Sequence, residues 1–235
     1  MSSTLLEIRG LNAWYSRKKQ ILSDFSLELA EHEAVGLIGL NGAGKTTFMK
    51  VLSGLLPTYH AEAVRFQGRP VTFREKGLRA MRYTVFAEDC SFGYFTFWEY
   101  LTYVFASYRQ KVPDVSGLVK GFHFEDYADV LLRDLSTGNC KKVFLITAFA
   151  LKPALLFLDE PVNGLDFQST EYLYKQIAGY KEYGMVLFSS HILESITLTS
   201  DRVLVLEEGQ IRQTFERGQI DAAKIREALG DEDAF

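Results

Sequence analysis

The sequence has few cysteines and no long apolar run. Its two cysteines, Cys90 and Cys140, form no CxxC pair, and its four histidines are scattered, so we expect neither structural zinc nor a disulfide framework, and a reducing compartment fits best. The longest apolar run, 143–151, is interrupted by Thr147 and is far shorter than the ~20 residues of a membrane-crossing helix. The first ten residues lack a basic start followed by an apolar stretch, so we expect no signal peptide.

An excess of positive charge is also missing. Thirty acidic residues outnumber 26 basic ones, and the formal net charge is -4, so we expect no nucleic-acid partner, although a local basic patch stays open. Hydrophobic residues make up 47% and aromatic residues 14% of the 235. This composition provides a sizeable core and excludes a disordered or collagen-like chain.

Short apolar segments alternate with helical ones along most of the chain, which predicts an α/β fold with a mostly parallel sheet and helical crossovers. Residues 5–30 have the pattern of short strands. The other expected strands are 34–38, 154–158, 185–188 and 203–206, and the expected helices are 46–55, 167–180 and 192–198.

An aromatic and helical stretch, 91–142, interrupts this alternation and predicts an inserted subdomain. We expect one domain over 1–235, with a core built from about 1–90 and 143–215. The remaining residues, about 216–235, mix charges with Ile and Leu and predict a helical tail on the surface.

A glycine-rich loop follows the expected strand 34–38. Residues 39–46 match the pattern of two glycines separated by four residues and followed by Lys and Thr. Its backbone N–H groups and the following helix N-terminus would bind phosphates, Lys45 would reach the β and γ phosphates, and Thr46 would offer its hydroxyl to Mg²⁺. A flexible turn with a solvated lysine is the alternative. The residues predicted to contact nucleotide here are Gly39, Leu40, Asn41, Gly42, Ala43, Gly44, Lys45, Thr46 and Thr47.

The apolar strand 154–158 ends in two acidic residues, Asp159 and Glu160. Open α/β sheets bind ligands at the carboxyl ends of their strands, so we predict that Asp159 holds the metal and that Glu160 faces the attacking water. Paired acids also occur as solvated strand ends. The presence of the phosphate loop favours the catalytic interpretation.

These motifs, with four more in the expected order, resemble the ATP-binding cassette (ABC) ATPases over residues 5–211. Residues 135–139 (LSTGN) stand where that family has its LSGGQ signature, and 161–166 (PVNGLD) match the loop after the acidic pair. His191 matches the switch histidine, and Tyr15 stands where an aromatic ring stacks on adenine. The resemblance implies a P-loop NTPase core with a mostly parallel sheet, an N-terminal antiparallel β subdomain and an inserted α-helical subdomain.

The resemblance also implies roles for these residues, with ATP and Mg as ligands. His191 would orient the γ-phosphate and the attacking water. Ser136 and Gly138 would close over the γ-phosphate bound to a second ATPase protomer, in a head-to-tail homodimer or heterodimer. Simpler interpretations remain: Trp14 could be the stacking ring in place of Tyr15, His191 could merely start a helix, and the residues at 136–138 could be only a helix N-cap.

Two segments depart from the family pattern. The signature has Thr137 for its first glycine and Asn139 for its glutamine. Glu88 aligns with a glutamine that contacts metal and water in the family. A carboxylate suits Mg²⁺ but adds negative charge beside Asp159, and a register error of one residue would leave Glu88 solvated.

Nine of the 17 positions from Phe92 to Tyr108 are aromatic. A helix from Phe97 onward would bury one stripe, formed by Phe97, Trp98, Leu101, Val104, Phe105 and Tyr108. That stripe leaves out Tyr100 and Tyr103. In the family this segment borders the groove that receives a cytoplasmic helix of the permease, so we predict that 92–103 exposes an apolar patch beside the nucleotide site.

The resemblance implies the ATPase subunit of a membrane transporter, cytoplasmic and peripheral at the inner face of the membrane through a separate permease. The short chain, the unusual signature and the lack of a regulatory C-terminal domain favour export. A soluble ABC-type ATPase with a non-membrane partner is the alternative, but this chain has one cassette and no coiled-coil arms. A catalytically silent module is disfavoured because Glu160 and His191 are present. The transported substrate is set by contacts in the permease.

Overall fold

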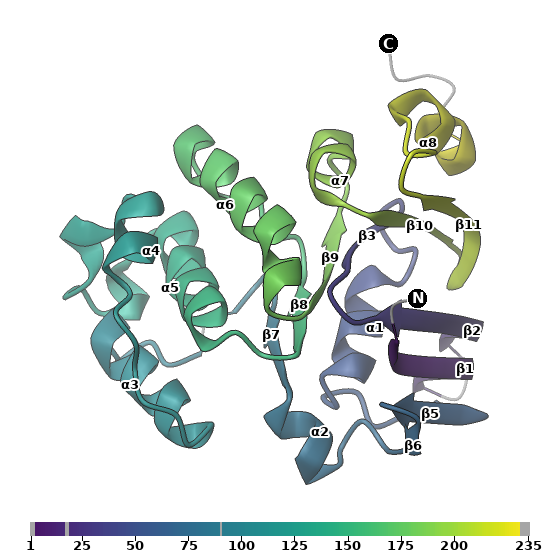
Figure 1. The fold of residues 1–235 in the computed structure, drawn as a ribbon, viewed down its shortest axis with the longest axis horizontal. Coiled ribbons are helices and arrows are strands. Elements are labelled where there is room, and N and C mark those ends of the chain that lie inside the picture. Colours follow the sequence, from purple (N-terminus) through teal and green to yellow (C-terminus); the bar gives the residue numbers. More distant parts are fainter. Residues whose placement is uncertain (1–2, 17–18, 90, 231–235) are drawn as a thin grey trace.

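The computed structural model describes residues 3–16, 19–89 and 91–230, which form two sheets surrounded by helices (Figure 1). Cys90 lies outside the described residues. The smaller sheet is antiparallel, with the order β2-β1-β5-β6 and with β4 paired to β1. Its strands are β1 (Thr4–Ser16), β2 (Lys19–Ala30), β4 (Tyr59–His60), β5 (Ala63–Phe66) and β6 (Arg69–Pro70). Strands are confirmed within 5–30, but β1 and β2 are 13 and 12 residues long and not short as expected.

The larger sheet has the order β11-β10-β3-β9-β8-β7, and all its neighbours are parallel except β11, which is antiparallel to β10. Its strands are β3 (Ala34–Ile38), β7 (Arg82–Val85), β8 (Leu155–Leu158), β9 (Met185–Ser190), β10 (Arg202–Glu207) and β11 (Gln210–Glu216). The four strands expected here are confirmed. Strands β7 and β11 were not predicted, because the first is only four residues long and the second is largely polar.

The register of this sheet brings several loops to one edge. Ile38 at the end of β3 pairs with Ser190 at the end of β9, and Leu158 at the end of β8 pairs with Phe188. The three strands are parallel, so the segments that follow them leave the sheet side by side. These segments are the glycine-rich loop, the acidic pair and the segment that contains His191.

Helices cover the larger sheet on one face, while the smaller sheet and α1 cover the other. Val35 and Leu37 of β3 pack in the apolar cluster of α1 and the antiparallel sheet, whereas Ala34 and Ile38 pack with α3 and α5 to α8. The helices are α1 (Lys45–Leu52), α2 (Lys76–Ala80), α3 (Phe97–Ser107), α4 (Ser116–Gly121), α5 (Thr137–Leu151), α6 (Phe167–Gly179), α7 (Leu193–Thr199) and α8 (Ala222–Leu229). Within the described ranges, none of them is long and apolar enough to cross a membrane.

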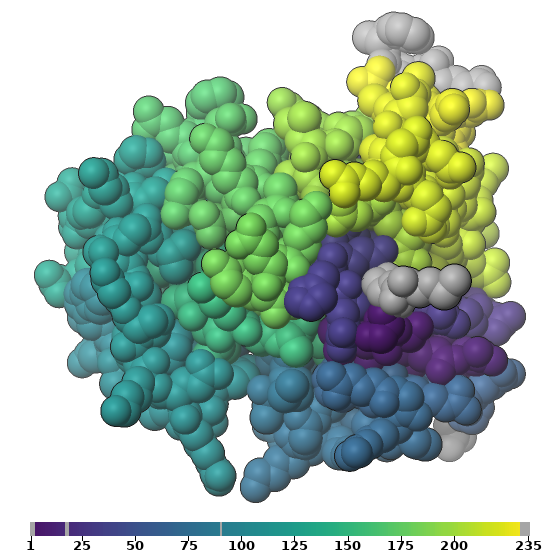
Figure 2. All heavy atoms as spheres, in the orientation of Figure 1, coloured from purple at the N-terminus to yellow at the C-terminus, as the bar shows by residue number. Residues whose placement is uncertain are grey.

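The expected helical insertion, 91–142, contains α3, α4 and the start of α5. It also holds two short 3-10 helices, η1 (Glu125–Tyr127) and η2 (Leu132–Asp134). A third, η3 (Tyr180–Glu182), follows α6. Figure 2 shows the C-terminal residues, in yellow, packed beside the N-terminal strands, in purple. The division of the chain into a core, a helical subdomain and a tail stays a prediction.

Helix α3 buries the predicted stripe at Phe97, Leu101, Val104 and Phe105, but the prediction is wrong at Trp98 and Tyr100. Trp98, expected on the buried stripe, is 43% exposed, and Tyr100, expected off it, is 5% exposed. The Tyr100 hydroxyl lies 2.6 Å from the Tyr83 hydroxyl, and its ring packs edge-on against Phe144. Tyr100 is buried because it packs against Tyr83 of β7 and Phe144 of α5. Helical spacing within 97–108 contains no information about these partners.

Candidate nucleotide-binding site

The glycine-rich loop leaves open space at the N-terminus of α1. Gly44 is the N-cap of this helix, with a φ of 113° that favours glycine. A Cβ added to Gly42 would meet no atom within 4 Å. Backbone N–H groups and the helix dipole at such a terminus attract phosphate, so the loop fits the phosphate chain of a nucleotide.

Lys45 begins α1 and turns back across the loop. Its side chain is buried, and Nζ donates a hydrogen bond to the Gly39 carbonyl at 2.6 Å. The same ammonium lies 3.5 Å from Oε1 of Glu160. Thr46 is exposed while Thr47 is buried, so the Thr46 hydroxyl is the one that a bound ligand can reach.

Asp159 lies at the end of β8 with a side chain that is completely buried. Its Oδ1 accepts a hydrogen bond from the Ser189 hydroxyl at 2.8 Å, and that hydroxyl accepts one from the Glu160 N–H at 2.9 Å. Its Oδ2 is buried and has no hydrogen-bond partner among the described residues. An unpaired buried carboxylate oxygen is costly, and a divalent cation is the kind of ligand that would satisfy it.

Glu160 connects the three loops at this edge. Its Oε2 lies 2.8 Å from His191 Nδ1, and its Oε1 faces Lys45. The residue has a φ of 46°, a left-handed conformation that is unusual outside glycine. The structure therefore brings Lys45, Glu160 and His191 together beside Asp159. This agrees with the expectation that ligands bind where the carboxyl ends of the strands meet.

Two contacts that hold the two ends of α1 were not predicted. The Gly209 N–H, in the turn between β10 and β11, donates to the Ala43 carbonyl at 3.0 Å. Arg82 on β7 donates to the carbonyls of Leu52 and Ser53 at the C-terminus of α1, the latter at 2.6 Å. Burial lowers the pKa of Arg82 to about 10, and the cation complements the negative end of the helix dipole.

The signature residues lie at the N-terminus of α5. The Ser136 hydroxyl caps this helix by accepting from the Asn139 N–H at 3.2 Å, which confirms the N-cap interpretation and leaves phosphate binding open. Gly138 packs so closely on the loop after the acidic pair that an added Cβ would lie 2.0 Å from the Gly164 carbonyl oxygen. Figure 1 shows β8 and β9 between α5 and α1.

Comparison with known proteins identifies the family. Residues 22–163 match the family model described as ABC transporter. The chain belongs to this family. It is 32% identical to AlbC of Bacillus subtilis over 92% of this chain and 93% of that protein, and 29% identical to EcsA of the same organism over 98% and 93%. Both are named as transporter ATP-binding proteins.

Solved structures agree with this assignment. A structure described as the ATP binding subunit of an ABC transporter is 26% identical, with a TM-score of 0.81, and the alignment covers 98% of this chain and 95% of that one. CbiO1 of Clostridium perfringens shares the fold at 23% identity, with a TM-score of 0.73 over 98% and 92% of the two chains. The fold is therefore the P-loop NTPase core of ABC ATP-binding subunits, and the family binds nucleotide.

The aromatic residue assigned to adenine stacking is accessible in this ABC protein. Tyr15 is 50% exposed at the end of β1, and the ammonium of Lys50 on α1 lies 5.9 Å from its ring centroid. Trp14 is only partly exposed. Tyr15 is therefore the better placed of the two rings to receive a base, and its contact with adenine stays a prediction.

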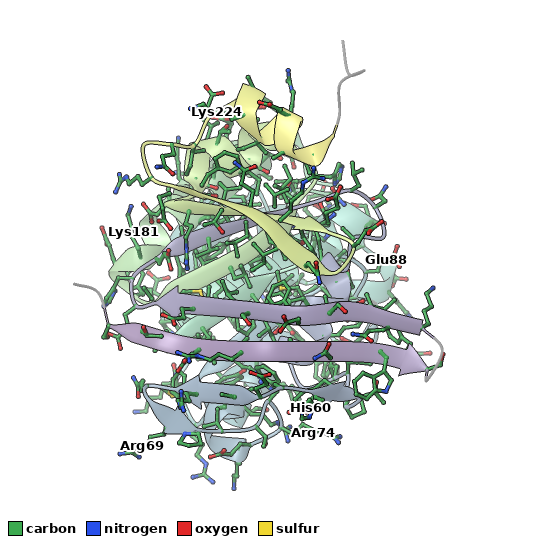
Figure 3. The ribbon with its side chains drawn as sticks, turned by 90° about the vertical axis from the view of Figure 1, so that its right-hand side faces the viewer. His60, Arg69, Arg74, Glu88, Lys181 and Lys224 are labelled. Carbon is green, nitrogen blue, oxygen red and sulfur yellow. The ribbon has the colours of Figure 1, made fainter. Side chains whose placement is uncertain are left out.

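Glu88 lies in the loop after β7 with an exposed side chain, at the edge of the molecule in Figure 3. Across the described ranges, no three His, Cys, Asp or Glu side chains group closely enough to hold a metal ion by themselves. Glu88 does line a cavity of about 530 Å³, together with Lys141 of α5. Its metal contact stays a prediction.

Two consecutive lysines of α5 were missed by the sequence analysis. Both are 4% exposed. Lys141 Nζ donates to the Glu160 carbonyl at 3.1 Å, and Lys142 Nζ lies 2.7 Å from Oδ2 of Asp166. They therefore hold both ends of the loop that follows β8. In the sequence, two adjacent lysines on a helix suggest a solvated face. Their partners, the Glu160 carbonyl and Asp166, become visible only in the folded structure.

The aromatic segment is only partly exposed. Phe92, Tyr94, Trp98 and Tyr103 are 37%, 77%, 43% and 50% exposed, whereas Phe97, Tyr100 and Phe105 are buried. We name the four exposed residues the aromatic patch. The ring of Phe92 packs against that of Tyr103 with centroids 5.2 Å apart. The exposure predicted for part of 92–103 is confirmed, and its position beside the nucleotide site stays a prediction.

Proposed function

We propose that this chain hydrolyses ATP in a Mg²⁺-dependent reaction and drives membrane transport as the nucleotide-binding subunit of an ABC transporter. One observation carries the enzymatic part. Glu160 is held between Lys45 and His191, next to a buried Asp159 whose Oδ2 has no partner among the described residues.

Asp159 and the exposed hydroxyl of Thr46 would hold Mg²⁺, since hard cations prefer oxygen ligands. The unpaired Asp159 Oδ2 fits this role. When bound, the metal neutralises charge on the phosphate oxygens. Glu88 would approach the same ion, directly or through one water.

Lys45 would exchange its contact with Glu160 for phosphate oxygens when ATP binds. The Glu160 carboxylate would then be free to accept a proton from the attacking water. His191, hydrogen-bonded to Glu160 through Nδ1, would keep that carboxylate in place and present its other ring nitrogen to the γ-phosphate. Phosphoryl transfer needs such positioning more than covalent chemistry.

A second ATPase protomer would complete the site with its own Ser136 and Gly138, in a head-to-tail homodimer or heterodimer. The exposed Ser136 hydroxyl and the N-terminus of α5 are suited to receive a phosphate from outside the chain. A separate permease would bind the aromatic patch and hold the subunit at the inner face of the membrane. Export is the favoured direction.

The decisive experiment compares the parent with Glu160→Gln. The parent should release phosphate from ATP only when Mg²⁺ is present. Glu160→Gln should lose about 10²- to 10⁴-fold in turnover because the amide cannot take up the proton. It should still bind ATP and should form a longer-lived dimer on size-exclusion chromatography. A variant that binds ATP normally and stays monomeric would contradict the head-to-tail arrangement, and a parent without phosphate release would contradict the ATPase.

A further inference from the structure

Lys141 is a buried cation that touches the main chain of the catalytic residue. Its side chain is 4% exposed, and Nζ donates to the Glu160 carbonyl at 3.1 Å. Glu160 has a left-handed φ of 46°, so the orientation of its peptide is strained for a residue with a side chain. A strong donor on that carbonyl stabilises the turn from which the Glu160 carboxylate projects.

One carbonyl does not compensate a buried ammonium, which has three donors and a full charge. The compensation comes from carboxylates. Burial lowers the pKa of Lys141, while Asp159, Glu160 and Glu88 act in the opposite direction. Glu88 lines the same cavity as Lys141, so the charges that act on this ammonium include the residue that replaces a neutral glutamine of the family.

We propose that Lys141 is a positioning residue for hydrolysis and that it is paired electrostatically with Glu88. The lysine fixes the main chain of Glu160, and its charge offsets the carboxylate that Glu88 adds near Asp159. The hydrolytic part rests on the proposed ATPase function. The electrostatic pairing is a property of the protein without nucleotide and can be tested separately.

Lys142 provides the matched comparison. It is equally buried and lies next in the sequence, but its ammonium binds Asp166, and it is not on the wall of the cavity that holds Glu88. A general effect of removing a buried lysine from α5 should therefore appear in both Lys141→Gln and Lys142→Gln. Coupling to Glu88 should appear in Lys141→Gln alone.

The first test is a double-mutant cycle in thermal unfolding, without ATP or Mg²⁺. Glu88→Gln should lower Tm by about 2 °C or more, whereas Glu125→Gln, an exposed glutamate of the same helical region, should leave it unchanged. Lys141→Gln should remove the effect of Glu88→Gln, while Lys142→Gln should preserve it. If Lys141→Gln does not fold, the comparison of Glu88→Gln with Glu125→Gln still decides: equal Tm values overturn the pairing.

The second test measures kcat and KM for ATP. Lys141→Gln should reduce kcat by about tenfold, with KM changed less than about twofold, because positioning of Glu160 is needed in the transition state. Lys141→Arg should recover most of that loss. In the Glu88→Gln background, the fall in kcat caused by Lys141→Gln should be smaller by about threefold. A normal kcat in Lys141→Gln overturns the positioning role. A parent without ATPase activity refutes the proposed function, while the unfolding cycle still judges the pairing.

Discussion

The sheet edge around Glu160 and the N-terminus of α5 both carry sequence motifs, but the chain completes only the first. At the sheet edge, Glu160 lies within 3.5 Å of both Lys45 and His191. At the start of α5, Ser136 is exposed and its hydroxyl serves its own helix through the Asn139 N–H. The first region is assembled within one chain, whereas the second would act only in the head-to-tail dimer that we propose.

The largest expected effect comes from removing the cation of the assembled region. Lys45→Ala should lower ATP turnover by about 10²-fold or more, because the ammonium is the charge closest to the expected phosphates. Phosphate release would measure the loss of turnover, and binding of a fluorescent ATP analogue would measure the loss of nucleotide affinity. Lys224→Ala, at an exposed position of α8, is the control and should match the parent. Normal turnover in Lys45→Ala would remove the phosphate loop from the mechanism.

The aromatic patch, like the start of α5, is an exposed surface for which we propose a partner. Replacing Tyr94 of the patch and its half-buried neighbour Phe95 with Ser should weaken assembly with a permease by about tenfold or more, as loss of interface aromatics does. ATP binding should not change. Co-purification with the detergent-solubilised permease would measure assembly, and Lys111→Ser, at an exposed position outside the patch, is the control. A double variant that assembles with full affinity would return these rings to an internal packing role.

The contrast between the two regions also explains what the sequence could predict. The phosphate loop and strand 34–38 are encoded by adjacent residues, and the meeting of Lys45 with Glu160 follows from the shared edge of parallel strands. Lys141 and Arg82 could not be found in this way. Their partners are main-chain carbonyls 19 and about 30 residues away, and no local pattern marks a carbonyl as the partner of a buried cation. Tyr100 was misplaced because a hydroxyl on β7 draws it inward.

Gly138 tests the contact between the two regions. Gly138→Ala would place a Cβ 2.0 Å from the Gly164 carbonyl oxygen, so backbone must move, at a cost of about 1–3 kcal/mol in the free energy of unfolding. Urea denaturation would measure it. Gly117→Ala is the control, because a Cβ there meets no atom within 4 Å. Equal stabilities of the two variants would show that the loop yields without strain.

The smallest effect concerns Asp166, which lies between the two regions at the start of α6. Burial raises its pKa, but hydrogen bonds from Lys142 and from Ser169 outweigh this and hold the pKa of Asp166 well below its usual range. The folded state therefore keeps the carboxylate ionised at a pH where the unfolded chain, with a pKa near ~3.9, takes up a proton. This contribution is complete above the unfolded pKa and is lost as the pH falls through the folded pKa.

Asp166→Asn removes that contribution while keeping an acceptor for the α6 N-cap. Because the Asp166 side chain is 52% exposed, solvent screening limits the effect to about 1 kcal/mol or less. The parent should exceed Asp166→Asn in the free energy of unfolding at pH 7, and the difference should shrink as the pH falls from about 5 toward 3. Urea denaturation across this range at low salt would measure it. A difference that stays constant with pH would mean that Lys142 holds Asp166 through geometry alone, and the link between the signature helix and the catalytic loop would then be steric, as the contact of Gly138 with Gly164 already is.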